Sequence, residues 1–120
     1  QRSTSIAHSL KPKIFDVYEA IRIVEDYIQT HLTSNLDVLS KEVKYMYMTH
    51  GLHLTTLRIM SSDVDDSVRL EYIRKNTSKI REYFSKWAKM IFDKRFSYKT
   101  KIIYLLYQLK AYKLIIKALS

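Results

Sequence analysis

Apolar side chains recur along this chain at intervals of three and four residues, with polar side chains between them. This spacing puts the apolar residues on one face of an α-helix, whereas a half-buried strand would alternate with a period of two. The pattern predicts helices within residues 14–32, 36–49, 52–59, 68–73, 80–91 and 97–119. The predicted fold class is therefore all-α, a single compact bundle of about five to six helices.

Polar residues mark the ends of these helices. We expect residues 1–13, with Pro12 near their end, to be a flexible leader, and residues 14–120 to form the bundle domain. Ser34, Ser62 or Asp65, and Ser97 each precede a predicted helix and can accept a hydrogen bond from an unpaired backbone N–H there. Gly51 predicts a tight corner with left-handed dihedrals, and residues 76–78 (Asn-Thr-Ser) predict another interruption.

The same periodicity predicts which side chains form the core. In the last predicted helix, the apolar face steps through Ile102, Leu106, Leu109, Tyr112 and Ile116 to Leu119. Over the whole chain, the side chains predicted to be buried are Ile21, Val24, Ile28, Leu39, Val43, Ile80, Phe84, Trp87, Ile91, Leu106 and Leu109.

Composition excludes several classes of protein. One glycine and one proline are too few for a turn-rich β fold, and the absence of cysteine excludes disulfides and thiolate metal sites. The cysteine usage suits an intracellular protein, and a nuclear location is compatible with it. No apolar run approaches the roughly 20 residues that cross a bilayer. The basic C-terminal helix could lie on an anionic membrane surface, but its apolar face is needed to close the bundle, so we expect no membrane partner.

The charge is distributed unevenly. Residues 1–72 hold 8 Lys and Arg against 10 Asp and Glu, whereas residues 73–120 hold 13 against 2, a net charge of +11. Such an asymmetry predicts an anionic partner for the second half, although a lysine surface can also serve solubility alone. The predicted partner-binding residues are Lys79, Arg81, Lys86, Lys89, Lys94, Arg95, Lys99 and Lys101.

No set of residues predicts catalysis, a metal or a cofactor. His50 and His53 could share a helical face, but a zinc site needs three or four ligands, and no cysteine is present to complete one. A single glycine cannot build a phosphate-binding loop or a nucleophile elbow. We therefore expect the domain not to be an enzyme.

The tyrosines of the last predicted helix allow two interpretations. Tyr104, Tyr107 and Tyr112 interleave with lysines, as in a platform on which nucleic-acid bases stack. Alternatively, Tyr107 and Tyr112 adjoin the apolar stripe and pack at the edge of the core, where each ring is buried and its hydroxyl stays hydrated.

Between Leu36 and Phe96, the order of the helices and several side chains follow one family's pattern. Leu36 and Leu39 begin it; the positions that follow are Thr49, Leu52, Thr56, Leu70, Ile73, Arg74, Lys75, Ile80, Phe84, Trp87 and Ile91. This segment resembles the N-terminal domain of transcription elongation factor TFIIS and the related integrase-binding domain of LEDGF. An insertion before Leu70 and the early place of Trp87 depart from that pattern. The resemblance implies a scaffold without catalysis that docks short acidic and aromatic motifs of transcription or chromatin proteins.

Together these observations predict a non-catalytic helical interaction domain that docks an acidic or disordered protein motif. Electrostatic steering by the basic half and apolar docking between helices would provide the binding. The alternatives are a basic nucleic-acid-binding domain, in which the same lysines meet phosphates, and a structural or oligomerisation module.

Overall fold

A computed structural model describes residues 10–120, and this part of the chain is helical and contains no strand. The elements are η1 (Pro12–Phe15), α2 (Asp16–His31), η2 (Thr33–Asn35), α3 (Leu36–Met46), η3 (Tyr47–His53), α4 (Leu54–Ser61), α5 (Asp66–Tyr83), η4 (Trp87–Met90), α6 (Tyr98–Gln108) and α7 (Tyr112–Leu119). The predicted all-α class is confirmed. Of the predicted leader, residues 1–9 lie outside the described residues, and Pro12 is the first residue of η1, where a missing N–H costs no hydrogen bond.

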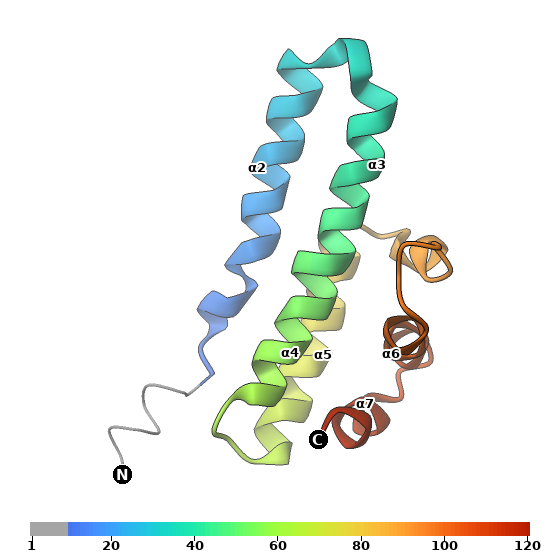
Figure 1. Ribbon diagram of the computed structural model, residues 1–120. Coiled ribbons are helices and arrows are strands. Elements are labelled where there is room, and N and C mark those ends of the chain that lie inside the picture. The colour runs from blue at the N-terminus through green and yellow to red at the C-terminus, as the bar shows by residue number, and fades with distance from the viewer. Residues whose placement is uncertain (1–9) are drawn as a thin grey trace.

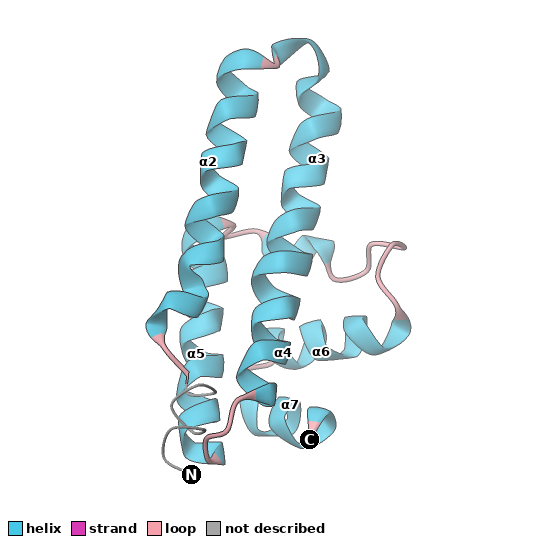
Figure 2. Ribbon diagram, turned by 60° about the vertical axis from the view of Figure 1, so that its left-hand side comes forward, coloured by secondary structure: helices cyan, strands magenta, loops and turns pink. Residues whose placement is uncertain are grey.

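The helices form an elongated bundle of 53 × 30 × 21 Å. α2 and α3 run antiparallel as a hairpin whose tip projects beyond the other helices, and α3, η3 and α4 continue one another as a single rod (Figure 1). α5 packs against α2 and α4, and α6 and α7 cross near the end of the bundle opposite the hairpin tip (Figure 2). Thus the C-terminal, basic half lies against the lower part of the rod and leaves the hairpin tip free.

Gly51 does not form the predicted corner. It lies in η3, a π-helical turn inside the continuous rod, and its φ angle is not positive. A Cβ atom at this position would lie 2.7 Å from Cε1 of Tyr18, whose ring is fully buried. The glycine is therefore explained by the close approach of α2 to η3 rather than by a turn.

A buried polar cluster joins α2, the rod, α5 and α6. The Tyr18 hydroxyl donates to Asn76 Oδ1 (2.6 Å), and Asn76 Nδ2 lies 3.1 Å from the carbonyl oxygen of Leu52. The Tyr107 hydroxyl lies 3.2 Å from Asn76 Nδ2 and 2.5 Å from Thr56 Oγ1. Because Thr56 donates its one hydroxyl proton to the Leu52 carbonyl (2.6 Å), Tyr107 donates to Thr56.

This cluster also explains why the interruption predicted at residues 76–78 is wrong. α5 continues through them, because Asn76 finds its partners on other helices and does not compete for its own backbone. The hydroxyls of Thr77 and Ser78 bond back to the carbonyl oxygens four residues earlier, at 3.4 and 3.5 Å.

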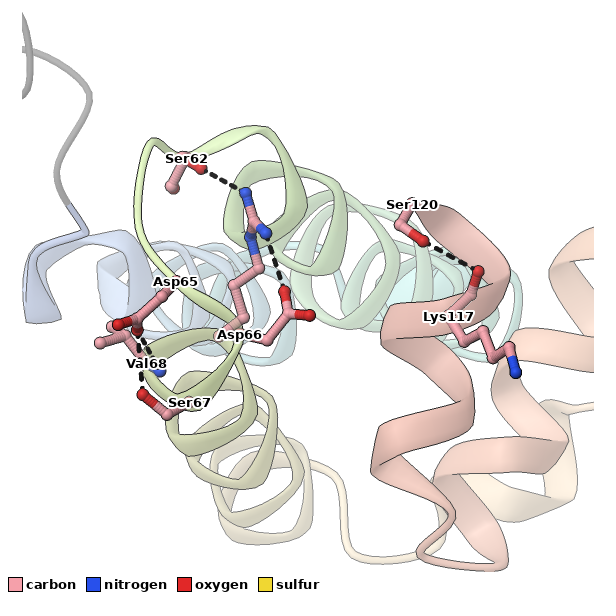
Figure 3. A network of polar contacts seen from close by, with 8 residues as sticks. Ser62, Asp65, Asp66, Ser67, Val68, Lys117 and Ser120 are labelled. Atoms are coloured by element: carbon pink, nitrogen blue, oxygen red, sulfur yellow. Dashed lines mark hydrogen bonds and ion pairs between the residues drawn. The ribbon is translucent and has the colours of Figure 1, made fainter.

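The corner between α4 and α5 is fixed by charged and polar side chains (Figure 3). The Asp65 carboxylate accepts a hydrogen bond from the backbone N–H of Val68 (3.3 Å), which confirms the predicted cap of α5. Arg69 spans the corner, donating to Asp66 Oδ1 (2.9 Å) and to the carbonyl oxygen of Ser62 (2.8 Å). In contrast, Ser34 does not cap α3, since it lies in η2 and makes no capping hydrogen bond.

The residues predicted to form the core fall into three groups: buried, partly buried and exposed. Ile21, Val43, Ile80, Trp87 and Ile91 are buried, which confirms these five. Four others, Ile28, Leu39, Phe84 and Leu106, are only partly buried. Val24 and Leu109 are 40% and 69% exposed, so their predicted burial is wrong.

The last predicted helix, residues 97–119, is in fact two helices with a different buried face. α6 buries Ile103, Tyr104 and Tyr107 instead of Ile102 and Leu109. α6 ends at Gln108, and Lys110, two residues further on, has a left-handed φ of 58°. The N–H of Ala111 bonds to the Leu106 carbonyl oxygen (2.9 Å), as in a Schellman motif, and α7 then starts in a new direction.

Candidate functional site

The segment 84–97 connects α5 to α6 and carries many of the basic residues predicted to bind a partner. Three large side chains anchor it: Trp87, Ile91 and Phe96 are 3%, 2% and 6% exposed. Short-range backbone hydrogen bonds shape it, among them Trp87 N–H to Phe84 O (3.1 Å) and Phe96 N–H to Asp93 O (3.1 Å). Between the anchors, Lys89, Phe92, Lys94 and Arg95 are exposed, whereas Ala88 and Met90 pack partly buried against the core.

Arg95 is a structural clamp within this segment. Its guanidinium donates to Glu42 Oε2 of α3 (2.8 Å) and to Asp93 Oδ1 (3.3 Å), and it lies 3.9 Å from the centre of the Tyr45 ring. The backbone N–H of Arg95 bonds to Asp93 (2.9 Å), and this bond is the largest cause that lowers the pKa of the Asp93 carboxyl. Arg95 thereby ties the segment to the rod.

The other predicted binding residues fall into two groups. Lys79 pairs with Glu82 at 3.7 Å, and Lys101 is partly buried and its charge also lowers the pKa of Asp93. The remaining five are exposed and take part in no ion pair within the described residues; they are Arg81, Lys86, Lys89, Lys94 and Lys99. Four of these five lie between Lys86 and Lys99, on the connecting segment and the start of α6.

The aromatic residues available on this surface differ from those that the sequence suggested. Tyr104 and Tyr107 are 0% and 1% exposed, so neither can stack on a base. The Tyr104 hydroxyl donates to the Met48 carbonyl oxygen (2.8 Å), and Tyr112 packs partly buried against the ring of Tyr107. The core interpretation is therefore correct for the rings of Tyr107 and Tyr112, but the Tyr107 hydroxyl is buried and bonded to Thr56 and Asn76 instead of being hydrated.

Two exposed aromatic residues were missed by the sequence reasoning. Phe92 is 69% exposed and Tyr98 is 83% exposed; Lys94 lies two residues after Phe92, and Lys99 directly follows Tyr98. Phe92 directly follows the buried Ile91, and Tyr98 directly follows Ser97, which caps α6 by accepting from Thr100 N–H (3.2 Å). Phe92 lies off the apolar stripe of residues 80–91, but Tyr98 lies four residues before Ile102 and continues the stripe predicted for the last helix, so the spacing gave no signal that Tyr98 points to solvent.

The buried polar cluster around Asn76 has the chemistry of a structural site. Burial raises the pKa of Tyr107 to about 12 and that of Tyr18 well above its ordinary value. Both phenols are therefore neutral near pH 7, and both are closed off from solvent. The cluster holds helices in register and offers no activated nucleophile or base.

In the described part of the chain, His50 and His53 do not belong to a metal centre. His50 is exposed, whereas His53 is partly buried against the edge of Tyr104, and burial lowers the pKa of His53. Within residues 10–120, no group of three or more His, Asp or Glu side chains could hold a metal ion. No helix in the same range is long and apolar enough to cross a membrane.

Comparison with protein-family models, curated proteins and solved structures finds no match to this chain.

Proposed function

We propose that this chain is a non-catalytic docking domain that binds an acidic, partly apolar segment of another protein. The docking surface runs over the connecting segment and the first turn of α6, and we call it the basic surface. It consists of Lys86, Lys89, Phe92, Lys94, Tyr98 and Lys99.

The observation that carries this proposal is the uncompensated charge of the basic surface. The acidic residues of its half of the chain are Glu82 and Asp93, and both already face a basic partner, Lys79 and Arg95 respectively. The lysines of the basic surface have no such partner within the described residues. Their combined field attracts an anionic group and accelerates its association.

The exposed aromatic side chains favour a partner that also carries apolar residues. Covering Phe92 and Tyr98 removes apolar area from water, and this contribution is not screened by salt. An acidic segment with interspersed apolar residues satisfies both features. The predicted resemblance to the TFIIS N-terminal domain supports the same class of partner, and would place it among transcription or chromatin proteins.

The basic surface is also held in place before a partner arrives. Trp87 and Phe96 fix the segment to the core, and Arg95 fixes it to α3. A rigid surface loses little conformational entropy on binding.

A salt titration with matched charge reversals tests the proposal. The probe is a fluorescent peptide rich in Glu, Leu and Phe, and the test variant reverses Lys86, Lys89, Lys94 and Lys99 to Glu. The control variant reverses four exposed lysines elsewhere, Lys41, Lys44, Lys113 and Lys117, with the same change in net charge. Arg95 is kept, because its loss would break the clamp to Glu42.

We expect the peptide to bind the native chain at physiological ionic strength, and the test variant to lose this binding while the control keeps most of it. Equal losses in the two variants would show that net charge alone attracts the peptide, and would overturn the proposed surface.

Nucleic acid is the second candidate partner, because exposed Phe92 and Tyr98 beside lysines could stack on unpaired bases. Phosphate contacts release counterions, so affinity for a single strand falls with a logarithmic slope of about −0.7 per contact. We expect binding to a thymidine oligonucleotide at low salt that largely vanishes near physiological salt. Sub-micromolar binding that persists there would make nucleic acid the primary ligand.

A further inference from the structure

α6 carries two apolar faces, and only one of them is used inside the bundle. The inner face is formed by Ile103, Tyr104 and Tyr107, which are at most 2% exposed. The opposite face carries Tyr98, Ile102 and Leu109, which are 83%, 45% and 69% exposed. A helix that is apolar on two faces has one face without a partner in the fold.

The outer residues are spaced as a helix-packing seam. Tyr98, Ile102, Leu105 and Leu109 follow one another at intervals of four, three and four residues. At about 100° per residue they fall within a stripe about 60° wide, and the stripe is about 16 Å long. Leu105 is partly buried and forms the floor of this stripe, while the other three project from it. This 3-4 spacing is the one by which two helices interdigitate.

Lysines border the seam on both sides. At about 100° per residue, Lys99 is turned to one side of Tyr98 and Lys101 to the other side of Ile102, so the two lysines lie on opposite edges of the stripe. These are the positions that flank the contact when two helices pack. α6 itself holds no acidic residue, and the nearest one, Asp93, is already bound by Arg95. A helix docked here therefore meets positive charge along both edges.

We propose that the outer face of α6 is a docking seam for an amphipathic helix of another protein, with apolar residues at 3-4 spacing and acidic residues at the flanking positions. This inference rests on the proposed function, since Tyr98 and Lys99 belong to both surfaces, and it specifies the conformation of the partner. A contact with a second copy would instead bring together two faces that both carry lysines and no acidic residue on α6, so like-charge repulsion opposes it.

Two peptides of identical composition test the seam. One carries Leu at four positions spaced four, three and four residues apart, with Glu at the flanking positions; the other has the same residues in scrambled order. Both are titrated into the full chain at physiological salt, with fluorescence anisotropy as the readout. The test variant is Ile102→Ser with Leu109→Ser, and the control variant is Ile23→Ser with Leu114→Ser, which removes similarly exposed apolar side chains from α2 and α7. Thermal melts followed by circular dichroism verify that both variants fold.

We expect the patterned peptide to bind at least about tenfold more tightly than the scrambled one, and the test variant to lose at least about tenfold in affinity, because two apolar contacts disappear. The control variant should bind like the native chain. Equal binding of both peptides would overturn the helical seam and leave the proposed function standing. Failure of both peptides to bind would overturn the seam and the proposed function together. A dimer in sedimentation equilibrium that Ile102→Ser with Leu109→Ser dissociates would identify a second copy as the occupant, and would also overturn the inference.

Discussion

At the scale of single residues, two positions of the backbone show what the packing demands. Gly51 is required because the Tyr18 ring lies where a side chain would begin. Lys110 is the converse case: a residue other than glycine stands where the backbone is left-handed, a conformation that glycine adopts without strain.

Gly51→Ala should destabilise the domain by about 1–3 kcal/mol, because the fully buried Tyr18 ring cannot move aside without breaking its hydrogen bond to Asn76. Chemical denaturation measures the change in the free energy of unfolding. In a Tyr18→Ala background the same substitution should be neutral or stabilising, since alanine favours a helix over glycine by about 1 kcal/mol. An equal cost in both backgrounds would show that Tyr18 is not the cause.

Lys110→Gly should stabilise the domain by about 1 kcal/mol, because it relieves the left-handed strain at the end of α6. The matched control is Lys113→Gly, an exposed position inside α7, which should cost about 1 kcal/mol. If both substitutions destabilise equally in thermal melts, the break between α6 and α7 does not lie at Lys110.

At the scale of elements, the connecting segment depends on few anchors. It contains one short 3-10 helix, η4, and otherwise turns, so its position is set by the side chains that enter the core. Trp87 is the largest of these side chains.

Trp87→Ala should therefore cost about 3–5 kcal/mol of stability, the usual loss for a buried tryptophan. The exposed Phe92 on the same segment provides the control, and Phe92→Ala should change the free energy of unfolding by less than about 0.5 kcal/mol. A loss under about 1 kcal/mol for Trp87 would instead assign it to the surface.

At the scale of the whole molecule, buried phenols from α2, η3 and α6 meet in one core. Burial raises the pKa values of Tyr18, Tyr47, Tyr104 and Tyr107 above those of the unfolded chain. The folded state therefore retains protons that the unfolded state loses above a pH of about 10, the ordinary tyrosine value. The stability from this effect is complete below that pH and is lost as the pH rises through the folded values.

We accordingly expect cooperative unfolding in alkali, in which buried tyrosinates appear together with the loss of helix. Ultraviolet absorbance and circular dichroism, followed in one titration, measure both events. Tyr107→Phe should weaken the pH dependence above 10, although it also removes the hydrogen bonds of the Tyr107 hydroxyl with Thr56 and Asn76. Independent, non-cooperative ionisation of all tyrosines near pH 10 would contradict the burial of these phenols.

The candidate surface could be located from the sequence only in part. The concentration of charge after residue 73 predicted the basic half, and the four lysines of the basic surface were among the residues named. The sequence could not separate Arg95 from them, because its partner Glu42 is 53 residues away. Nor could it place Phe92 and Tyr98 on the surface, because an aromatic residue beside a helix end is compatible with either environment.

The sequence by itself determined the helical class, most helix positions, the caps at Asp65 and Ser97, and the asymmetry of charge. The helices and their caps depend on residues within about one helical turn of each other, and these residues can be read directly from the sequence. Tertiary structure alone decided the role of Gly51, the continuity of α5 through Asn76, and which of two apolar faces α6 buries. Each depends on a distant partner. Asn76 is hydrogen-bonded to Tyr18, which is 58 residues away, and Tyr107 is hydrogen-bonded to Thr56, which is 51 residues away. A buried polar group is stable only once such a partner is in place, and the spacing of residues along a chain does not specify which partner that will be.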